Sequence, residues 1–415
     1  MSVSYDDLKD NCTTNYESEN TLNEFENPYI FIRDNYFGNG GYSPYSSFSY
    51  LIRHPREIIE FYRDRVKNAV LENIFAPLQD LFIDPIVSAN IEIKTQNNIL
   101  NKIIEQTKVE NQANKSILDF KLYGKCVFSV YTDIVQDGEN VSVDQNIYPD
   151  IKQVFPADIK TIKMNGLNVD SAEYIQKESI DRVKVPVSVV YKDNVFTRKT
   201  LAWRTEKGNV TLEDLGEAKR ITDFDGRKYG VLNKIGLSLT DIPKTFALAQ
   251  MQKLLFNLDT QRLDTLRKSG FPILVIQTNQ EIEELTLSEN MIMKIPAPDA
   301  GDGSINMPEW LETQLNGVDM TTEIIAEKKS AIYKVFTNGL FSDNIQYTTV
   351  MSSVIATKSF SNVVNTLYKA YQMILEKILD DVIMVYNLNT TYNVTYPDIK
   401  FVEESTDEDI KEILS

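Results

Sequence analysis

The scarcity of histidine limits the catalytic chemistry that this chain could perform. His54 is the single histidine among 415 residues, whereas Ser/His/Asp triads, Cys/His pairs and His-containing zinc sites need more imidazoles or differently placed ones. It stands between Arg53 and Pro55, where a loop enters a segment with helical periodicity. We therefore expect His54 to be a surface or packing residue.

The sequences that faintly resemble phosphate or calcium sites are incomplete. Gly124-Lys125 precedes a predicted strand, and Asp119 occupies the position of the first glycine of a phosphate-binding loop. The acidic runs at 223–226 and 299–303 lack the ligand spacing and the closing glutamate of a calcium loop. We interpret both runs as turns.

Paired carboxylates give no stronger signal. Glu283-Glu284 and Asp380-Asp381 have no partner in the sequence that would separate their pKa values, as a glycosidase requires. The sequence therefore predicts no catalytic residue, no metal site and no cofactor, and we expect that the chain is not an enzyme.

Composition indicates a large globular protein with an acidic surface. Hydrophobic residues make up 42% of the chain, and 60 acidic against 43 basic residues give a net charge of −17. Such a surface does not grip nucleic acid by neutralising phosphates. It is compatible with DNA sliding past it, and equally with simple solubility.

Compartment and redox state follow from the same composition. No apolar run is long enough for a membrane span, and the first residues are acidic and polar, so we expect a soluble protein made in a cytoplasm. Cys12 and Cys126 lie in a polar and an apolar context, respectively. We expect both thiols to stay reduced.

The elements predicted for the first half of the chain indicate an α+β fold. Residues 1–48 have few periodic apolar positions and are expected to form an irregular arm. One helix is predicted from Pro55 to about Phe75, and Pro77 interrupts the helical pattern just after it. A second helix is predicted from Asn97 to Leu122 and should end at Gly124. The strands predicted next, which favour a mixed sheet over a βαβ repeat, are at 127–134, 153–155, 185–191 and 196–204.

Three long helical stretches follow, interrupted by a short β-like insertion. The first is predicted at 239–268 and the second at 308–336, with strands at 271–278 and 291–295 between them. The third, at 347–386, would span about 60 Å at 1.5 Å per residue. A last strand is expected at 392–396.

This order of elements resembles the portal protein family of tailed phages. Local patches agree with it: His54-Pro-Arg-Glu57 is similar to the family's wing entry, and Leu122-Tyr-Gly-Lys-Cys-Val-Phe-Ser-Val130 to its helix-to-strand step. The further patches are Gln153-Val-Phe-Pro-Ala-Asp158, Ser238 to Gly270, and Phe271-Pro-Ile-Leu-Val-Ile276.

The resemblance implies a portal-like α+β fold, mainly helical, without a substantial crown. The implied parts are an arm (1–48), a wing (49–237), stem helix 1 (238–270), an αβ clip (271–307), stem helix 2 (308–336), a tunnel loop (337–347), a long wing helix with a closing strand (348–402) and an acidic tail (403–415).

The function implied by the resemblance is that of a ring-shaped channel in the virion. The ring, commonly of twelve subunits, would be assembled in the host cytoplasm and sit at one capsid vertex, where double-stranded DNA passes during packaging and ejection. The implied partners are the major capsid protein, any scaffolding protein, the terminase, and then a head-completion adaptor or tail protein, without a membrane.

The resemblance also suggests which residues contact partners. Those expected along the DNA channel are Asn338, Asn344 and Gln346 in the tunnel loop and Lys328, Lys329 and Lys334 on the helix before it. The lysines could instead belong to a solvated face or form salt bridges with a neighbouring subunit. The residues expected in the clip are Phe271, Glu283, Glu284, Asp299, Asp302 and Trp310, the last being equally compatible with a core position.

Two other classes remain compatible with the composition. One is a different virion structural protein, such as a collar, adaptor or tail subunit. The other is a metal-dependent enzyme acting on nucleic acid, for which paired carboxylates would bind the metal. Neither explains the order of helix, αβ insertion, helix, loop and long helix.

Overall fold

The computed structural model contains two compact units. It describes residues 27–46, 48–55, 57–133, 148–165, 168–180, 183–206, 209–214, 226–239, 241–269, 273–277, 292–295, 309–311, 316–336 and 350–399. We call the described residues of 34–74 and 248–336 the helical unit, and those of 27–33, 75–247 and 350–399 the sheet unit. The mixture of helices and sheets confirms the α+β class.

The sheet unit contains an eight-stranded sheet. Its strands are β2 (Lys125–Asp133), β3 (Asp150–Gln153), β4 (Ile159–Asn165), β5 (Asn168–Ile180), β6 (Val183–Lys192), β7 (Val195–Glu206), β8 (Asn209–Asp214) and β9 (Gly226–Gly236). They are ordered β3-β2-β9-β7-β6-β5-β4, and β8 pairs with β7.

The pairing within this sheet differs from the prediction of a mixed sheet. Every described pair in it is antiparallel. The physical reason is visible between β6 and β7, where Asp193 and Asn194 have φ of 52° and 60°. A two-residue turn of this kind joins adjacent antiparallel strands.

One face of the sheet has an aromatic core. Tyr131, Tyr174, Tyr191 and Phe196 are buried there with several valines. The ring of Phe196 lies 5.3 Å from that of Tyr131 and 4.7 Å from that of Tyr191, measured between centroids. Alternation along the strands places these side chains on the same face.

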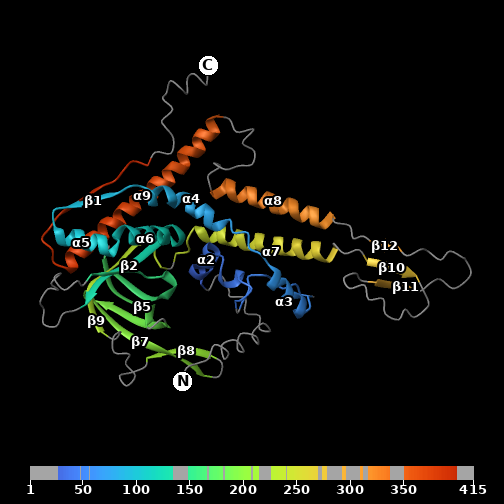
Figure 1. Cartoon of the computed structure of the whole chain (residues 1–415), viewed down its shortest axis with the longest axis horizontal. Coiled ribbons are helices and arrows are strands. Elements are labelled where there is room, and N and C mark those ends of the chain that lie inside the picture. The colour runs from blue at the N-terminus through green and yellow to red at the C-terminus, as the bar shows by residue number, and fades with distance from the viewer. Residues whose placement is uncertain are drawn as a thin grey trace, which may run out of the picture. The chain divides into compact units, whose positions relative to one another are not determined.

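The helices of this unit include α4 (Phe75–Val87), α5 (Asn98–Thr107), α6 (Val109–Tyr123) and α9 (Val350–Val385). Helices α6 and α9 pack on strands of the sheet, and α4 packs on α6 and α9 (Figure 1). The prediction of one long C-terminal helix is confirmed, because α9 has 36 residues. Its buried stripe includes Tyr371, Ile374, Ile378 and Val382, at the spacing expected of a helix face.

The ends of these elements follow from local chemistry. The Asn97 side chain caps α5 by accepting from the amides of Ile99 and Leu100. Gly124 ends α6 with φ of 67°, as predicted. The predicted final strand is also confirmed: β13 (Tyr392–Thr395) pairs antiparallel with β1 (Glu92–Thr95).

Two helix predictions in this region were wrong. The helix expected from Asn97 to Leu122 is two helices, because Lys108 adopts a left-handed φ of 49° between α5 and α6. Pro77 does not end a helix but lies in the first turn of α4. A proline is tolerated there because the first amides of a helix have no intrahelical partner.

The expectation of an irregular arm up to residue 48 was also wrong for part of that range. Pro28–Phe37 forms helix α2, and Gly40–Tyr42 forms a short 3-10 turn, η2. The helix is held by aromatic packing, since the rings of Phe31 and Phe246 meet edge to face at 5.7 Å. Within the predicted arm, residues 1–26 and 47 lie outside the described residues.

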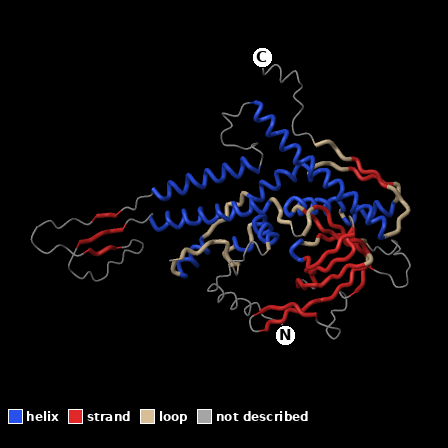
Figure 2. Tube along the Cα trace, turned by 180° about the vertical axis from the view of Figure 1, so that it is seen from behind, coloured by secondary structure: helices blue, strands red, loops and turns tan. Residues whose placement is uncertain are grey.

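The helical unit is built from helices α3 (Ile59–Asn68), α7 (Thr245–Ser269, from residue 248 onward) and α8 (Asn316–Phe336). Helices α7 and α8 run side by side in Figure 1 and Figure 2. Leu255 and Phe256 of α7 and Ile325 of α8 line a common cavity of only about 10 Å³ together with Val70 and Ile74. The two helices and the 70–74 segment are therefore closely packed.

A small sheet lies beyond the ends of α7 and α8 in both figures. It consists of β10 (Ile273–Gln277), β11 (Ile292–Ile295) and β12 (Glu309–Leu311), in the order β11-β10-β12. The β10–β11 pair is parallel and the β10–β12 pair antiparallel. This sheet stands where the sequence predicted a short β-like insertion.

Two boundaries in this unit differ from the prediction. The first helix was expected from residue 239, but α7 begins at Thr245, just after Pro243. The second was expected from Pro308, but residues 309–311 form β12 and α8 begins at Asn316. Because Trp310 pairs with Leu274 of β10, residues 309–311 form a strand and not the start of the helix. The tunnel loop and the acidic tail lie outside the described residues.

Candidate partner-binding surface

The positions expected to contact DNA are only partly described. Asn338, Asn344 and Gln346 lie outside the described residues, so their role stays a prediction. Lys328, Lys329 and Lys334 lie on α8. Since successive residues turn by about 100° around a helix, Lys328 and Lys334 are about 120° apart, and Lys329 lies on a third side.

The environments of these lysines differ as well. Lys329 Nζ lies 2.5 Å from Glu72 Oε2, within the helical unit. It flanks the buried face that includes Ile325 and Ile332, whereas Lys328 and Lys334 are exposed. The structure thus places one of the three lysines in an intramolecular ion pair and does not bring the three into one row.

The positions expected in the clip are described only at its last strand. Phe271, Glu283, Glu284, Asp299 and Asp302 lie outside the described residues. The backbone of Trp310 pairs with Leu274 in the small sheet. The clip positions therefore stay predictions.

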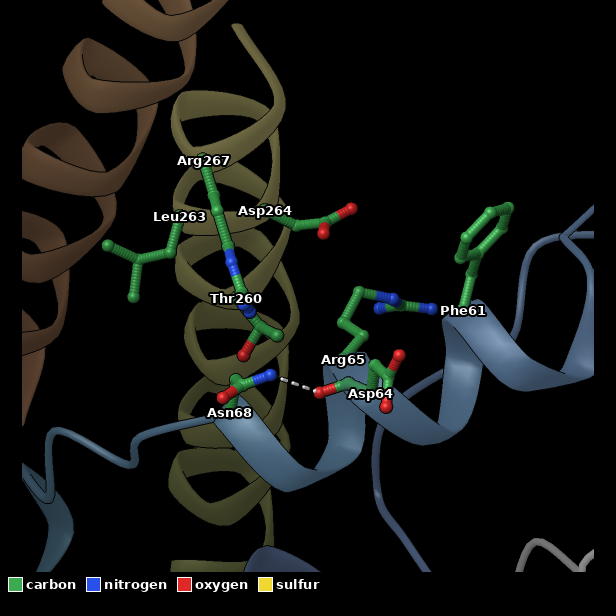
Figure 3. Close-up of a pocket in the computed structure, with 8 residues that line it drawn as sticks. All are labelled: Phe61, Asp64, Arg65, Asn68, Thr260, Leu263, Asp264 and Arg267. Carbon is green, nitrogen blue, oxygen red and sulfur yellow. Dashed lines mark hydrogen bonds between the residues drawn. The ribbon is translucent and has the colours of Figure 1, made fainter. Parts of the chain in front are cut away.

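A groove that the sequence did not predict lies between α3 and α7. Its volume is about 580 Å³. Figure 3 shows how side chains from the two helices line it. Those from α3 are Phe61, Asp64, Arg65 and Asn68, and those from α7 are Thr260, Leu263, Asp264 and Arg267.

An almost buried ion pair fixes the α3 wall of this groove. Arg65 Nη2 donates to Glu57 Oε2 at 2.6 Å and to the carbonyl of Ile52 at 2.9 Å, and Arg65 Nε donates to Glu57 Oε1 at 2.9 Å. The side chains are only 4% and 9% exposed. This bidentate geometry sets the position of α3 relative to the chain that enters it.

The charge of Glu57 is held by the same contacts. Burial acts to raise the pKa of Glu57, but hydrogen bonds from Arg65 and from the His54 amide bring that pKa below its ordinary value. The amide of His54 donates to Glu57 Oε2 at 3.2 Å, while the residue itself is exposed. His54 is therefore a surface residue, as expected, which contributes through its backbone.

Apolar and polar groups of the groove are incompletely covered. Phe61 is 54% and Leu263 40% exposed, although both are large hydrophobic side chains. Thr260 is only 4% exposed, yet its hydroxyl has no hydrogen-bond partner among the described residues. Buried hydroxyls are normally paired. The groove thus combines partly exposed apolar side chains with a buried hydroxyl that has no described partner, a composition that is typical of surfaces that bind another protein.

The sheet unit contains a buried lysine, Lys125, which in the sequence belonged only to an incomplete phosphate-loop pattern. Lys125 Nζ donates to the Tyr29 hydroxyl at 2.7 Å, to the Asp241 carbonyl at 3.1 Å and to the Ser238 carbonyl. These three bonds use all the donors of an ammonium group. Burial lowers the pKa of Lys125 to about 8. Because the side chain is fully buried, we interpret it as a structural clamp.

A buried carboxylate links α9 to the sheet in the same unit. Asp381 is 2% exposed, accepts a hydrogen bond from the side-chain amide of Asn233 on β9, and has Lys377 Nζ at 3.4 Å. Burial raises the pKa of Asp381 to about 6, although Lys377 and Asn233 counteract the rise. Of the two adjacent carboxyl groups, that of Asp380 is therefore exposed and that of Asp381 is buried.

Cys126 is buried and has a free thiol, as the apolar context predicted, and burial raises its pKa. Within the described ranges, no three His, Cys, Asp or Glu side chains gather as a metal site would require. No described helix combines the length and the hydrophobicity needed to cross a membrane.

Comparison with known proteins gives no family assignment. No protein-family model matches the sequence, and no curated protein matches it.

Proposed function

We propose that this chain is a phage portal protein, a subunit of the ring-shaped channel at one capsid vertex. The observation that carries the proposal is the order of elements in the C-terminal half: α7, the three-stranded sheet, α8 and then the 36-residue α9. In this proposal α7 and α8 are the stem helices, the sheet β10–β12 belongs to the clip, and α9 is the long wing helix.

The geometry of the helical unit supports this assignment. Helices α7 and α8 lie side by side, and the chain between them forms a sheet whose described strands pair only with one another (Figure 2). A separate small sheet at the end of a helix pair offers a surface for docking another protein. The terminase would bind there during packaging, and a head-completion adaptor or tail protein afterwards.

The distribution of exposed hydrophobic residues supports assembly. Twelve of the twenty large hydrophobic side chains that are exposed in the described residues belong to the helical unit, although it is the smaller unit. Exposed apolar side chains in such density are typical of surfaces that contact other subunits. They are Phe37, Tyr45, Ile52, Ile58, Phe61, Val70, Met251, Leu254, Leu263, Leu266, Met320 and Val335.

The net charge of −17 agrees with a channel through which DNA slides without binding tightly to the wall. A ring multiplies this charge by its subunit number, so a largely repulsive wall faces the phosphates and leaves no deep electrostatic minimum. The proposed location is the virion, and the major capsid protein and any scaffolding protein complete the set of proposed partners.

Imaging of the purified full-length protein tests the proposal. Negative-stain micrographs should show rings with a central hole. Compact particles of one or two subunits at several salt and protein concentrations would overturn it and favour an adaptor or an enzyme instead.

A further inference from the structure

The last turns of α9 meet the sheet at one polar contact within an apolar surface. Asp381 is 2% exposed and accepts a hydrogen bond from the side-chain amide of Asn233 on β9. Its neighbours along the helix, Ile378 and Val382, are fully buried. Phe128 of β2 lies directly opposite Asn233 on the same face of the sheet and is buried as well. Burial removes the water that solvates a charge, so this carboxyl group is more stable neutral than ionised.

The groups around Asp381 compensate this burial only in part. Lys377 Nζ lies 3.4 Å from Asp381 Oδ1, but the Lys377 side chain is 39% exposed, so water screens its charge. Asp380 is a like charge on the same helix and opposes the ionisation of Asp381. Burial therefore outweighs the contacts with Lys377 and Asn233 and raises the pKa of Asp381 to about 6.

Among the described residues, Asp381 forms no ion pair other than that with Lys377. From β6, the titratable group that interacts with it is Tyr191: burial, and in smaller part the charge of Asp381, raises the pKa of Tyr191. From α6, the charge of Glu110 adds to the effect of burial in raising the pKa of Tyr371, which lies about three helical turns before Asp381. The protonation of Asp381 is therefore governed by burial and by its own helix.

Strand β13 is attached to the same turns of α9. The Tyr392 hydroxyl donates to Asp380 Oδ1 at 2.8 Å and to the Glu376 carbonyl at 3.2 Å. The hydroxyl of Tyr396, just after the strand, donates to Glu376 Oε1 at 3.2 Å. Strands β13 and β1 form a two-stranded sheet, which is at best marginally stable by itself. We therefore expect β13 to move with the end of α9.

We propose that the end of α9 and strand β13 form a proton-sensitive latch, which is closed on the sheet when Asp381 is neutral and opens more readily when Asp381 is charged. The latch concerns the sheet unit alone and does not rest on the proposed ring. Opening brings Asp381 into water, where its pKa returns to that of an ordinary aspartate.

The closed latch loses stability as pH rises. Below the ordinary aspartate pKa, Asp381 is protonated in the closed and the open state alike. Because the pKa in the closed state is raised to about 6, the contribution of Asp381 to closure is fully present in acid and is lost as pH rises through 6. Between pH 5 and pH 7.5, this linkage increases the equilibrium constant for opening about tenfold.

Amide hydrogen exchange of the full-length protein tests the latch. After correction for the intrinsic pH dependence of exchange, the protection of amides in residues 380–395 should fall about tenfold from pH 5 to pH 7.5. Their exchange should depend only weakly on urea, because a local opening exposes far less surface than unfolding does. Asp381→Asn should remove the pH dependence, whereas the matched control Asp380→Asn, at the adjacent exposed carboxyl group, should keep it.

A second variant, Lys377→Met, tests the same cluster without altering Asp381. Without this cation the charged form of Asp381 is less stable in the closed latch. Protection at pH 7.5 should therefore fall further, while protection at pH 5 should change little. The latch is overturned if protection is the same at both pH values, if its pH dependence survives in Asp381→Asn, or if these amides exchange only through unfolding, with the urea dependence of the core strands.

Discussion

Arg65 of α3 and Glu57 form a bidentate ion pair, with Arg65 Nη2 2.6 Å from Glu57 Oε2, and their side chains are only 4% and 9% exposed. The pair fixes one wall of the α3–α7 groove. The two residues are eight positions apart in the sequence: Glu57 precedes α3, and Arg65 lies within it. Removing one partner would leave the other buried without a counter-charge.

Arg65→Ala should therefore destabilise the protein strongly. We expect a loss of about 3 kcal/mol in the free energy of unfolding, because an unpaired carboxylate would stay buried. The matched control is Lys67→Ala on the same helix, whose ion pair with Asp64 is exposed and 3.9 Å long. That change should cost less than about 1 kcal/mol. Urea denaturation of both variants measures the difference, and similar losses would contradict the account.

Lys125→Met should remove the clamp between α2, β2 and the turn before α7. The Tyr29 hydroxyl and the carbonyls of Ser238 and Asp241 would lose their shared donor. We expect a loss of about 2 kcal/mol or more. Lys115→Met, at an exposed position of α6, is the control and should be nearly neutral.

The same site should also respond to pH in a defined direction. The pKa of Lys125 is lowered to about 8 in the folded state. Between pH 8 and the ordinary lysine pKa, the unfolded chain binds more protons than the folded one, so this group makes stability rise with pH. The stability gap between the unaltered chain and Lys125→Met should widen from pH 8 to pH 10. A constant gap would show that the lysine titrates normally.

Asp381→Asn should stabilise the protein at neutral pH but not in acid. The folded-state pKa of Asp381 is raised to about 6, so its contribution is fully present below the ordinary aspartate pKa and is lost as pH rises through 6. Asparagine keeps an acceptor for Asn233 without the buried charge. We expect a gain of about 2 kcal/mol at pH 7.5 and none at pH 4.

Thermal unfolding at the two pH values measures this effect. Asp84→Asn on α4 provides the control, because Asp84 is exposed. It should show no comparable dependence on pH. A loss of stability for Asp381→Asn at pH 7.5 would mean that the ion pair with Lys377 outweighs the cost of burial.

Replacement of residues 271–315 by a short Gly/Ser linker should separate two functions of the proposed portal. The described strands of the small sheet pair only with one another, so α7 and α8 keep their packing around Leu255, Phe256 and Ile325. Rings should still form, whereas binding of a phage terminase, the proposed packaging partner, should be lost. Retained terminase binding would place the docking surface elsewhere.

Long, strongly periodic elements could be predicted from the sequence. Helix α9 was predicted because Tyr371, Ile374, Ile378 and Val382 recur at helical steps, and they form its buried stripe. Strands β6 and β7 were predicted from their β-branched and aromatic residues. In these segments local preference and tertiary packing agree.

Elements defined by their neighbours could not be predicted in the same way. Strand β9 contains several glycines and lysines, and its place between β2 and β7 comes from pairing with residues about a hundred positions away. Helix α2 was missed because aromatic contacts stabilise it, such as that between Phe31 and Phe246. No local pattern reports such contacts.

The candidate surface depended even more on the tertiary structure. Phe61 and Leu263 are separated by two hundred residues, and only the packing of α3 near α7 makes them neighbours. The His54-Pro-Arg-Glu57 sequence marked the entry of α3, but nothing in it shows that Glu57 pairs with Arg65. The burial of Thr260 is likewise invisible in the sequence.

The mass of the assembled protein tests the central claim most directly. Native mass spectrometry of the full-length chain should give one dominant species whose mass is a high multiple of 47.5 kDa, about twelvefold for the ring expected of a portal. A monomer or dimer as the only species, across salt and protein concentrations, would contradict the account.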